Sequence, residues 1–412
     1  MAHRALIGGT AYEISGGKTL VGGTAYSIAK GRTLVGGTGY DVPFISPAKV
    51  KDLYSTSIHT TPLAFMTYAN GYWVVGGTTT LNGSTIAYTT QIDGSWTTQT
   101  ISVDEGNIYL NGIAYGDGYW VLAGQKRIGT SSGDYAVILY ATSLSGPWTE
   151  KVLWGYSSIV GSSAECITYA GGYWAVGGCF KNSSTYYARI AYATSLSGTW
   201  TTKDLWNGTG SSINCITYAN NLWAIGGTGY SNGYIARIGY AANISASFTT
   251  KDLWTSGGYE YGDIYSITYA NGYWVVAGHH LESYNGSSYA RIAYSTSLSG
   301  TWTTKDLWNG PSNSSVISQA NYICYADGKW VAVGCYYDGT STYTRLLYAT
   351  SLAGTWTVIT LWNSVATYYS VPPKYVNYAD GYWLVGGNYF NGSSTFYSRI
   401  TYGESLESFE QL

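Results

Sequence analysis

The sequence predicts an all-β protein, and three features support that prediction. Only 10% of the residues are charged, so the Glu, Lys and Arg that cover most helix surfaces are scarce. The 44 tyrosines and 17 tryptophans favour strands, while the 54 glycines favour tight turns. The third feature is a phrase, first seen as Tyr-Ala-Asn-Gly-Tyr-Trp-Val-Val-Gly-Gly at 68–77, that occurs seven times at intervals of roughly 50 residues.

Each of these seven units is expected to form four strands. In the clearest unit the strands are placed at 167–169, 173–177, 189–193 and 200–206. A glycine-containing turn follows the first strand, and a Ser-Leu-Ser-Gly turn follows the third, both of which suit tight hairpins. Four strands repeated seven times predict a seven-bladed β-propeller with four-stranded blades.

The strand that is missing from the last repeat is found before the first repeat. Strand four usually ends in Lys-Asp-Leu-Trp, but the last unit lacks this ending and runs instead through 405–412. A similar stretch, Lys-Asp-Leu-Tyr, stands near the front at 51–54. We therefore expect residues 49–54 to pair into the blade formed by 374–402, so that the propeller covers 48–412 and exposes no sheet edge there.

Residues 1–47 form a different segment, which carries its own shorter repeat. Two copies of Gly-Gly-Thr-Ala-Tyr begin at Gly8 and Gly22, and a Gly-Gly-Thr-Gly-Tyr variant begins at Gly36. So short a segment is too small to bury an adequate core alone. We expect a β-hairpin repeat, followed by a linker marked by Pro43 and Pro47, that serves attachment or oligomerisation. The alternative is a plain hairpin array needed only for folding.

Tryptophan and arginine recur at fixed positions of the repeat, which favours a structural role for both. Every tryptophan falls in strand two, in the turn before strand four, or at the end of strand four. Such side chains suit the space between twisted sheets. Five arginines share one position in strand three, where stacking on a neighbouring aromatic ring would hold them; they are Arg189, Arg237, Arg291, Arg345 and Arg399.

The turn before strand four resembles a known motif. Thr-Ser-Leu-Ser-Gly-Thr-Trp at 194–200 is similar to the Asp-box hairpin, Ser-x-Asp-x-Gly-x-Thr-Trp, of sialidase-like and BNR-repeat propellers. Here the stretch from Ser to Trp is two residues shorter and its Asp is usually Ser, with only Asp93 keeping the acid. The resemblance covers 48–412 and implies the fold. It implies no activity, because Asp boxes lie away from the active site in that family.

The first segment also resembles a known class of protein. Its Gly-Gly-Thr-x-Tyr repeats are similar to the N-termini of phage and prophage structural proteins from Gram-positive gut bacteria. The resemblance implies that residues 1–47 attach the chain to other virion or particle proteins. Self-association of the chain is kept as an alternative.

The connections between strands two and three, and between strand four and the next blade, vary in length and content. Both kinds reach the same face of a propeller, and they are rich in Tyr, Ser, Asn and Gly, as antibody loops are. We interpret this face as a binding face for a host surface glycan or receptor, the alternative being unconstrained drift of loops. The candidate binding residues are Tyr259, Tyr261, Asp263, His279, His280, Glu282, Tyr336, Tyr337, Asp338, Tyr389 and Phe390.

Composition and motifs favour a protein without a catalytic site, metal or cofactor. The five cysteines, at 166, 179, 215, 324 and 335, show no CxxC spacing, and no nucleotide-binding or Ser/His/Asp motif occurs. A net charge of −2 argues against nucleic acid as a partner. No apolar run is long enough to span a membrane, and the N-terminus lacks the apolar core of a signal peptide.

These observations lead to one interpretation and two alternatives. The preferred one is a non-enzymatic structural protein of a phage or phage-like particle, of tail or baseplate fibre type, assembled in the bacterial cytoplasm. It binds a host through the variable face. The first alternative is a sialidase-like glycoside hydrolase or lyase, using carboxylates such as Glu260, Asp263 or Glu282. The second is a purely structural virion decoration protein.

Overall fold

The computed structural model describes residues 46–412 apart from 57–62, 81–82, 130–131, 156–160, 232, 255–260, 282–285, 312–317, 366–373 and 393–394, and the backbone of six strands before them. Those six strands form three antiparallel hairpins: β1 (His3–Ile7) with β2 (Thr10–Ile14), β3 (Lys18–Val21) with β4 (Thr24–Ser27), and β5 (Lys30–Val35) with β6 (Thr38–Pro43). Within the described residues, no helix has the length and apolar character needed to cross a bilayer.

The chain then forms seven four-stranded blades. Blades one to three are β8 (Phe65–Ala69), β9 (Tyr72–Thr80), β10 (Gly83–Thr89), β11 (Thr97–Ile101); β12 (Asn107–Gly116), β13 (Tyr119–Ile128), β14 (Ser132–Ala141), β15 (Thr149–Gly155); and β16 (Ser163–Ala170), β17 (Tyr173–Asn182), β18 (Thr185–Ala193), β19 (Thr201–Asn207). Blades four and five are β20 (Ser212–Ala219), β21 (Leu222–Tyr230), β22 (Tyr234–Ala241), β23 (Thr249–Asp252); and β24 (Tyr261–Ala270), β25 (Tyr273–Leu281), β26 (Ser288–Ser295), β27 (Thr303–Asn309). Blades six and seven are β28 (Gln319–Ala326), β29 (Lys329–Tyr337), β30 (Ser341–Ala349), β31 (Thr357–Val365); and β32 (Tyr375–Ala379), β33 (Tyr382–Phe390), β34 (Phe396–Gly403), β7 (Lys49–Thr56).

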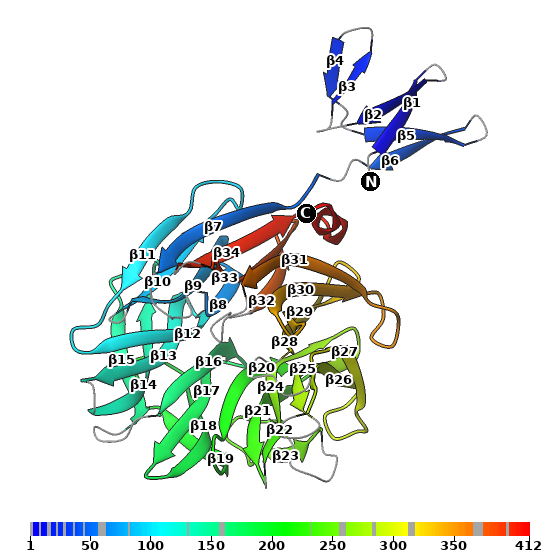
Figure 1. The fold of residues 1–412 in the computed structure, drawn as a ribbon. Helices are drawn as coiled ribbons and strands as arrows, with labels where there is room; N and C mark the ends of the chain where they lie inside the picture. The colour runs from blue at the N-terminus through cyan, green and yellow to red at the C-terminus, as the bar shows by residue number, and fades with distance from the viewer. Residues whose placement is uncertain are drawn as a thin grey trace.

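The first strand of every blade lies at the centre of the ring, so the predicted seven-bladed propeller is confirmed. Figure 1 shows β8, β12, β16, β20, β24, β28 and β32 around that centre. Blades four and five touch through one parallel pairing of Tyr234 with Tyr261, which joins their sheets into one of eight strands.

Ring closure occurs where the sequence places it. Strand β7 pairs antiparallel with β34, from Tyr402 opposite Lys49 to Phe396 opposite Thr56. The Lys51 ammonium then donates to the Gly94 carbonyl oxygen at 2.7 Å, which links the seventh blade to the first. A short 3-10 helix, η1 (Leu406–Gln411), follows β34 and is tied to blade six by an ion pair of 2.6 Å between Glu407 and Lys329.

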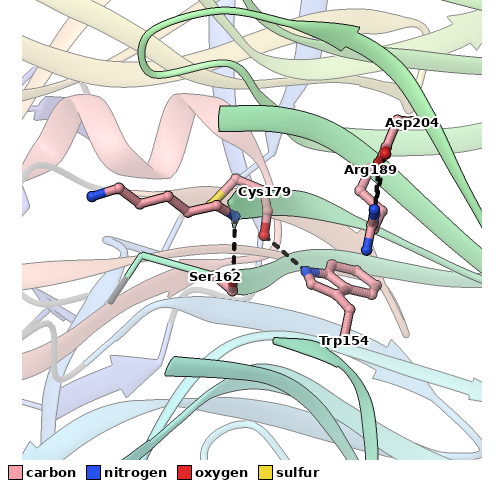
Figure 2. Close-up of polar contacts among 6 residues, drawn as sticks. Trp154, Ser162, Cys179, Arg189 and Asp204 are labelled. Atoms are coloured by element: carbon pink, nitrogen blue, oxygen red, sulfur yellow. Dashed lines mark hydrogen bonds and ion pairs between the residues drawn. The ribbon is translucent and has the colours of Figure 1, made fainter. Parts of the chain in front are cut away.

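The Lys-Asp-Leu-Trp ending of strand four joins neighbouring strands and neighbouring blades. In blade three, Asp204 accepts two hydrogen bonds from Arg189 of its own blade, at 2.6 and 2.8 Å. The indole N–H of Trp154, which ends the Lys-Val-Leu-Trp form of this stretch in blade two, donates to the Cys179 carbonyl oxygen of blade three at 2.8 Å (Figure 2). The acid therefore holds the sheet together, and this tryptophan joins one sheet to the next, as Trp206 and Trp308 do.

The lysine of the same ending binds the turn before strand four in the next blade, a contact that we call the blade clasp. Lys251 donates to the carbonyl oxygens of Ser299 and Gly300, at 3.4 and 2.6 Å. The same arrangement recurs for Lys151, Lys203 and Lys305. These contacts explain why both the Lys and the Ser-Leu-Ser-Gly turn recur in the sequence.

We expect Lys251→Met to lower the free energy of unfolding by about 1 kcal/mol, because it removes these half-exposed hydrogen bonds and keeps the aliphatic stem. Chemical unfolding of the full chain measures this change. Thr250→Ala, at an exposed position of the same strand, is the control, with an expected change within about 0.5 kcal/mol. If Lys251→Met and the parent have equal free energies of unfolding, the lysine does not stabilise the contact between neighbouring blades.

The tryptophans occupy structural positions, as predicted. In strand two they are at most 2% exposed, and each ring lies about 5 Å from a strand-one tyrosine, as in the 4.7 Å pair of Trp174 and Tyr169. In four of the turns before strand four, the indole N–H donates to the carbonyl oxygen four residues earlier, as from Trp200 to Leu196 at 3.2 Å. The second contact closes the turn that resembles an Asp box.

Strands two and three extend further than the sequence analysis places them. In blade three they pair as far as Asn182 opposite Thr185, so only two residues connect them. The residues beyond the repeated phrase are rich in Tyr, Thr and Ser, which pair well across an antiparallel ladder. Several segments that we expected to be variable loops are therefore strand ends, whose side chains alternate between the two faces of a blade.

Candidate functional site

The innermost strands share an irregularity near their first residues. In blades two to six, each pairs with strand two through a β-bulge that leaves one residue outside the ladder; these residues are Asn111, Glu165, Asn214, Tyr265 and Asn321. Ala64 and Lys374 hold the corresponding positions in blades one and seven, and both donate their backbone N–H to strand two. We call these seven residues the mouth ring.

The mouth ring lines a cavity in the half of the central channel nearer the start of the innermost strands. All seven residues line a volume of about 250 Å³, together with Gln319 and Tyr375. At roughly 30 Å³ for each water molecule in the liquid, this is the space of about eight waters, or of one sugar ring. Because strand one starts at the face where the variable connections lie, the cavity is on the predicted binding face.

The mouth ring carries two opposite charges. Glu165 accepts a hydrogen bond from the Ser163 hydroxyl, while the Lys374 ammonium has no hydrogen bond or ion pair within the described part of the chain. Burial lowers the pKa of Lys374, and the negative charge of Glu165 opposes that shift. Both side chains are half-buried, so both keep some access to the cavity.

Two asparagines of the mouth ring hold neighbouring blades together. The Asn111 amide donates to the Ala164 carbonyl oxygen at 3.1 Å, and the Asn214 amide donates to the Ile264 carbonyl oxygen at 3.1 Å. Each acceptor immediately precedes a mouth-ring residue of another blade. The asparagines therefore fix the spacing of the ring and also line the cavity.

Asp263 and His279, both predicted as candidates, lie together and both contact the Tyr265 hydroxyl. The Tyr265 hydroxyl is 3.0 Å from His279 Nδ1 and 3.4 Å from Asp263 Oδ2, and those two atoms are 3.8 Å apart. The Thr228 hydroxyl also donates to Asp263. Burial lowers the pKa of His279, against a smaller opposite effect of Asp263, and burial raises the pKa of Tyr265. The imidazole and the carboxylate thus position a tyrosine that lines the cavity.

Other candidates pack within the blades. Tyr336 lies under the Arg345 guanidinium at 3.7 Å, and Tyr389 lies under that of Arg399 at 3.5 Å. His280 and Phe390 are only 4% and 7% exposed, so in this conformation they contribute to packing.

The remaining candidates lie at blade ends. Tyr261 contacts the ring of Tyr234 at 5.1 Å. The Tyr337 hydroxyl donates to the Gly339 carbonyl oxygen at 2.7 Å. Asp338 accepts the N–H groups of Thr340 and Ser341, which closes an exposed turn and lowers the pKa of Asp338. Tyr259 and Glu282, like the alternative carboxylate Glu260, lie outside the described residues.

The five equivalent arginines have the structural role predicted for them. Four form ion pairs with an aspartate of strand four, at 2.5 to 2.6 Å, as Arg189 does with Asp204 (Figure 2). The fifth, Arg345, faces Thr360 and stacks on Tyr336. All five belong to strand three of their blades, so they form no cluster in the channel.

The sequence analysis missed the mouth ring, although a signal was present. Its members stand four residues before the first tyrosine of the repeated phrase, as Glu165 stands before Tyr169. At this position the blades carry Ala, Asn, Glu, Asn, Tyr, Asn and Lys, whereas flanking positions vary little in charge. An aligned set of repeats would have shown one position of mixed charge in an otherwise uniform unit.

Comparison with known proteins shows a likeness of fold. No protein-family model matches the sequence, and no curated protein matches it. Among solved structures, Ycf48 bound to a D1 peptide matches at 12% identity and a TM-score of 0.51, over 88% of this chain and 98% of that one. The phage phi92 endosialidase matches at 11% and 0.49, over 89% and 71%. The β-propeller domain of the Trilobed protease from Pyrococcus furiosus matches at 7% and 0.47, over 83% and 93%. The chain is thus a β-propeller similar in fold to Ycf48.

Proposed function

We propose that this protein is a non-enzymatic structural component of a phage or phage-like particle, of tail or baseplate fibre type. Residues 1–47 attach it to other particle proteins, and the mouth of the propeller channel binds a host surface glycan. The contrast between a uniform repeat and a varied mouth ring carries the binding role. Packing alone would be served by the same residue in every blade, as it is for the tryptophans of strand two.

The chemistry of the mouth supports a sugar as the ligand. Asparagine, glutamate and lysine side chains can exchange hydrogen bonds with hydroxyl groups, and aromatic rings pack against the apolar face of a sugar. Tyr265 and Tyr375 both line the cavity. A ligand site of this kind is concave, largely preformed and equipped with a few converging polar groups.

Two observations favour binding over hydrolysis in this proposal. Glycoside hydrolysis generally uses a pair of carboxylates about 5–9.5 Å apart, and Glu165 is the single carboxylate among the described residues that line the mouth. The recurrent arginines stay on strand three, where they are stacked or ion-paired.

A screen of the full chain against bacterial surface glycans, scored for binding and for released sugar, tests the proposal. We expect binding without release. We also expect about tenfold weaker binding for Ala64→Gln, equivalent to about 1.4 kcal/mol, because the longer side chain enters the cavity. Ser197→Ala, in an exposed constant turn on the opposite face, should bind as the parent does.

Two outcomes would contradict the proposal. Release of sugar would favour the sialidase-like hydrolase or lyase. Neither binding nor release, from a chain with an unchanged thermal unfolding midpoint, would favour the purely structural decoration protein.

A further inference from the structure

We infer that the mouth accepts a zwitterionic end group, one that carries an ammonium and an acid on a single residue. This inference rests on the proposed binding function and specifies the ligand class. Its basis is the presence of Glu165 and Lys374 at equivalent positions of blades three and seven, around one small cavity.

The two charges do not neutralise one another directly. The ion pairs within the described residues join an arginine, a lysine or His279 to acids in the blades or in η1, and none joins Lys374 to Glu165. Two blades, one and two, lie between the two residues along the shorter way around the ring. The cavity therefore lies between an ammonium and a carboxylate.

Charge complementarity then distinguishes the possible occupants. A neutral group that displaced water would leave the Lys374 ammonium without a partner and Glu165 with only the Ser163 hydroxyl, which is unfavourable in a confined site. A purely anionic group would be repelled by Glu165, and a purely cationic group would be repelled by Lys374. An ammonium beside Glu165 and an acid beside Lys374 satisfy both side chains through charge-assisted hydrogen bonds.

The size of the cavity indicates that the bound group is the end of a glycan chain. A volume of about 250 Å³ admits one residue-sized group, and Tyr375, one position after Lys374, borders the same space. A polymer threaded through the site would need more room than this. We therefore infer recognition of a terminal or branch-end residue of a surface glycan, such as a sugar that carries phosphoethanolamine.

Four probes built on one hexose test the charge requirement. They are the phosphoethanolamine ester (both charges), its N-acetyl derivative (negative), the aminoethyl glycoside (positive) and the hydroxyethyl glycoside (neutral). Calorimetric titration of the full chain should give at least about tenfold tighter binding for the first probe than for the other three, the range of a charge-assisted hydrogen bond.

Single substitutions assign each charge to its partner. Glu165→Gln should weaken the zwitterionic and positive probes about tenfold and tighten the negative one. Lys374→Met should weaken the zwitterionic and negative probes about tenfold and tighten the positive one. Exchanging the two residues (Glu165→Lys with Lys374→Glu) should restore part of the binding, because the positions are equivalent. Lys203→Met, at a blade clasp, is the control and should bind as the parent does.

The outcomes separate this inference from the proposed function. Equal affinity for the neutral and zwitterionic probes would overturn the inference. So would unchanged binding of the zwitterionic probe by folded Glu165→Gln and Lys374→Met proteins. Binding of other glycans in the screen would then leave the proposed function standing. Failure of all four probes and of every glycan in the screen would overturn both.

Discussion

Deletion of residues 48–56 is expected to prevent the chain from forming a stable, soluble monomer. The deletion removes β7 and so exposes the full edge of β34. It also removes the ion pair of Asp52 with Arg399 at 2.6 Å and the contact of Lys51 with the first blade. Leu53 packs against a core cluster formed jointly by blades one and seven, and that contact is lost as well. An unpaired edge and an exposed apolar interface favour aggregation.

Size-exclusion chromatography and thermal unfolding measure this effect. Deletion of residues 1–45 is the matched control, because it removes a longer segment and leaves β7 in place. The control should remain a folded propeller and, on the proposed function, should fail to attach to a particle. A soluble 48–56 deletion with the parent's unfolding midpoint would contradict closure by β7.

The second large effect is expected from Gly178→Ala in strand two. A Cβ at this position would lie 2.0 Å from the Ser163 carbonyl oxygen and 3.0 Å from Ala164 Cα. Both atoms belong to backbone beside the β-bulge that presents Glu165, so neither can move without shifting the innermost strand. We expect a loss of about 3 kcal/mol in the free energy of unfolding, at the upper end of the usual cost of overpacking.

Gly112→Ala provides the comparison for this substitution. Gly112 follows the bulge of blade two, and an added Cβ would meet its nearest atoms at 3.5 Å, an ordinary contact. We expect its free energy of unfolding to change by less than about 1 kcal/mol. Similar urea unfolding midpoints for the two variants would show that the bulge does not impose glycine at 178.

The sequence predicts the fold well because the same residue types recur at the same positions of every blade. The tryptophans, the Lys-Asp-Leu-Trp ending and the glycine turns each have one structural role that recurs, and the displaced copy at 51–54 reveals closure. Strand ends are predicted less well. Segments such as His279–His280 were expected in loops because they depart from the repeat, yet backbone pairing continues through them.

The candidate site is harder to predict, for a physical reason. The mouth ring depends on a bulge that shifts the pairing register by one residue, and strand-pattern reasoning assumes regular alternation. It also depends on seven residues, each from a different blade, that line one cavity. Asp263 and His279 were predicted separately, but their common contact with Tyr265 follows only from the register of β24 and β25.

Lysine labelling of the full chain, with and without a bound surface glycan, tests the central claim most directly. An amine-reactive acetylating reagent followed by mass spectrometry reports the access to each ammonium. We expect the ligand to protect Lys374 and to leave Lys151, Lys203, Lys251 and Lys305 at the blade clasps unchanged. Saturating binding with unchanged labelling of Lys374 would place the ligand elsewhere and contradict recognition at the channel mouth.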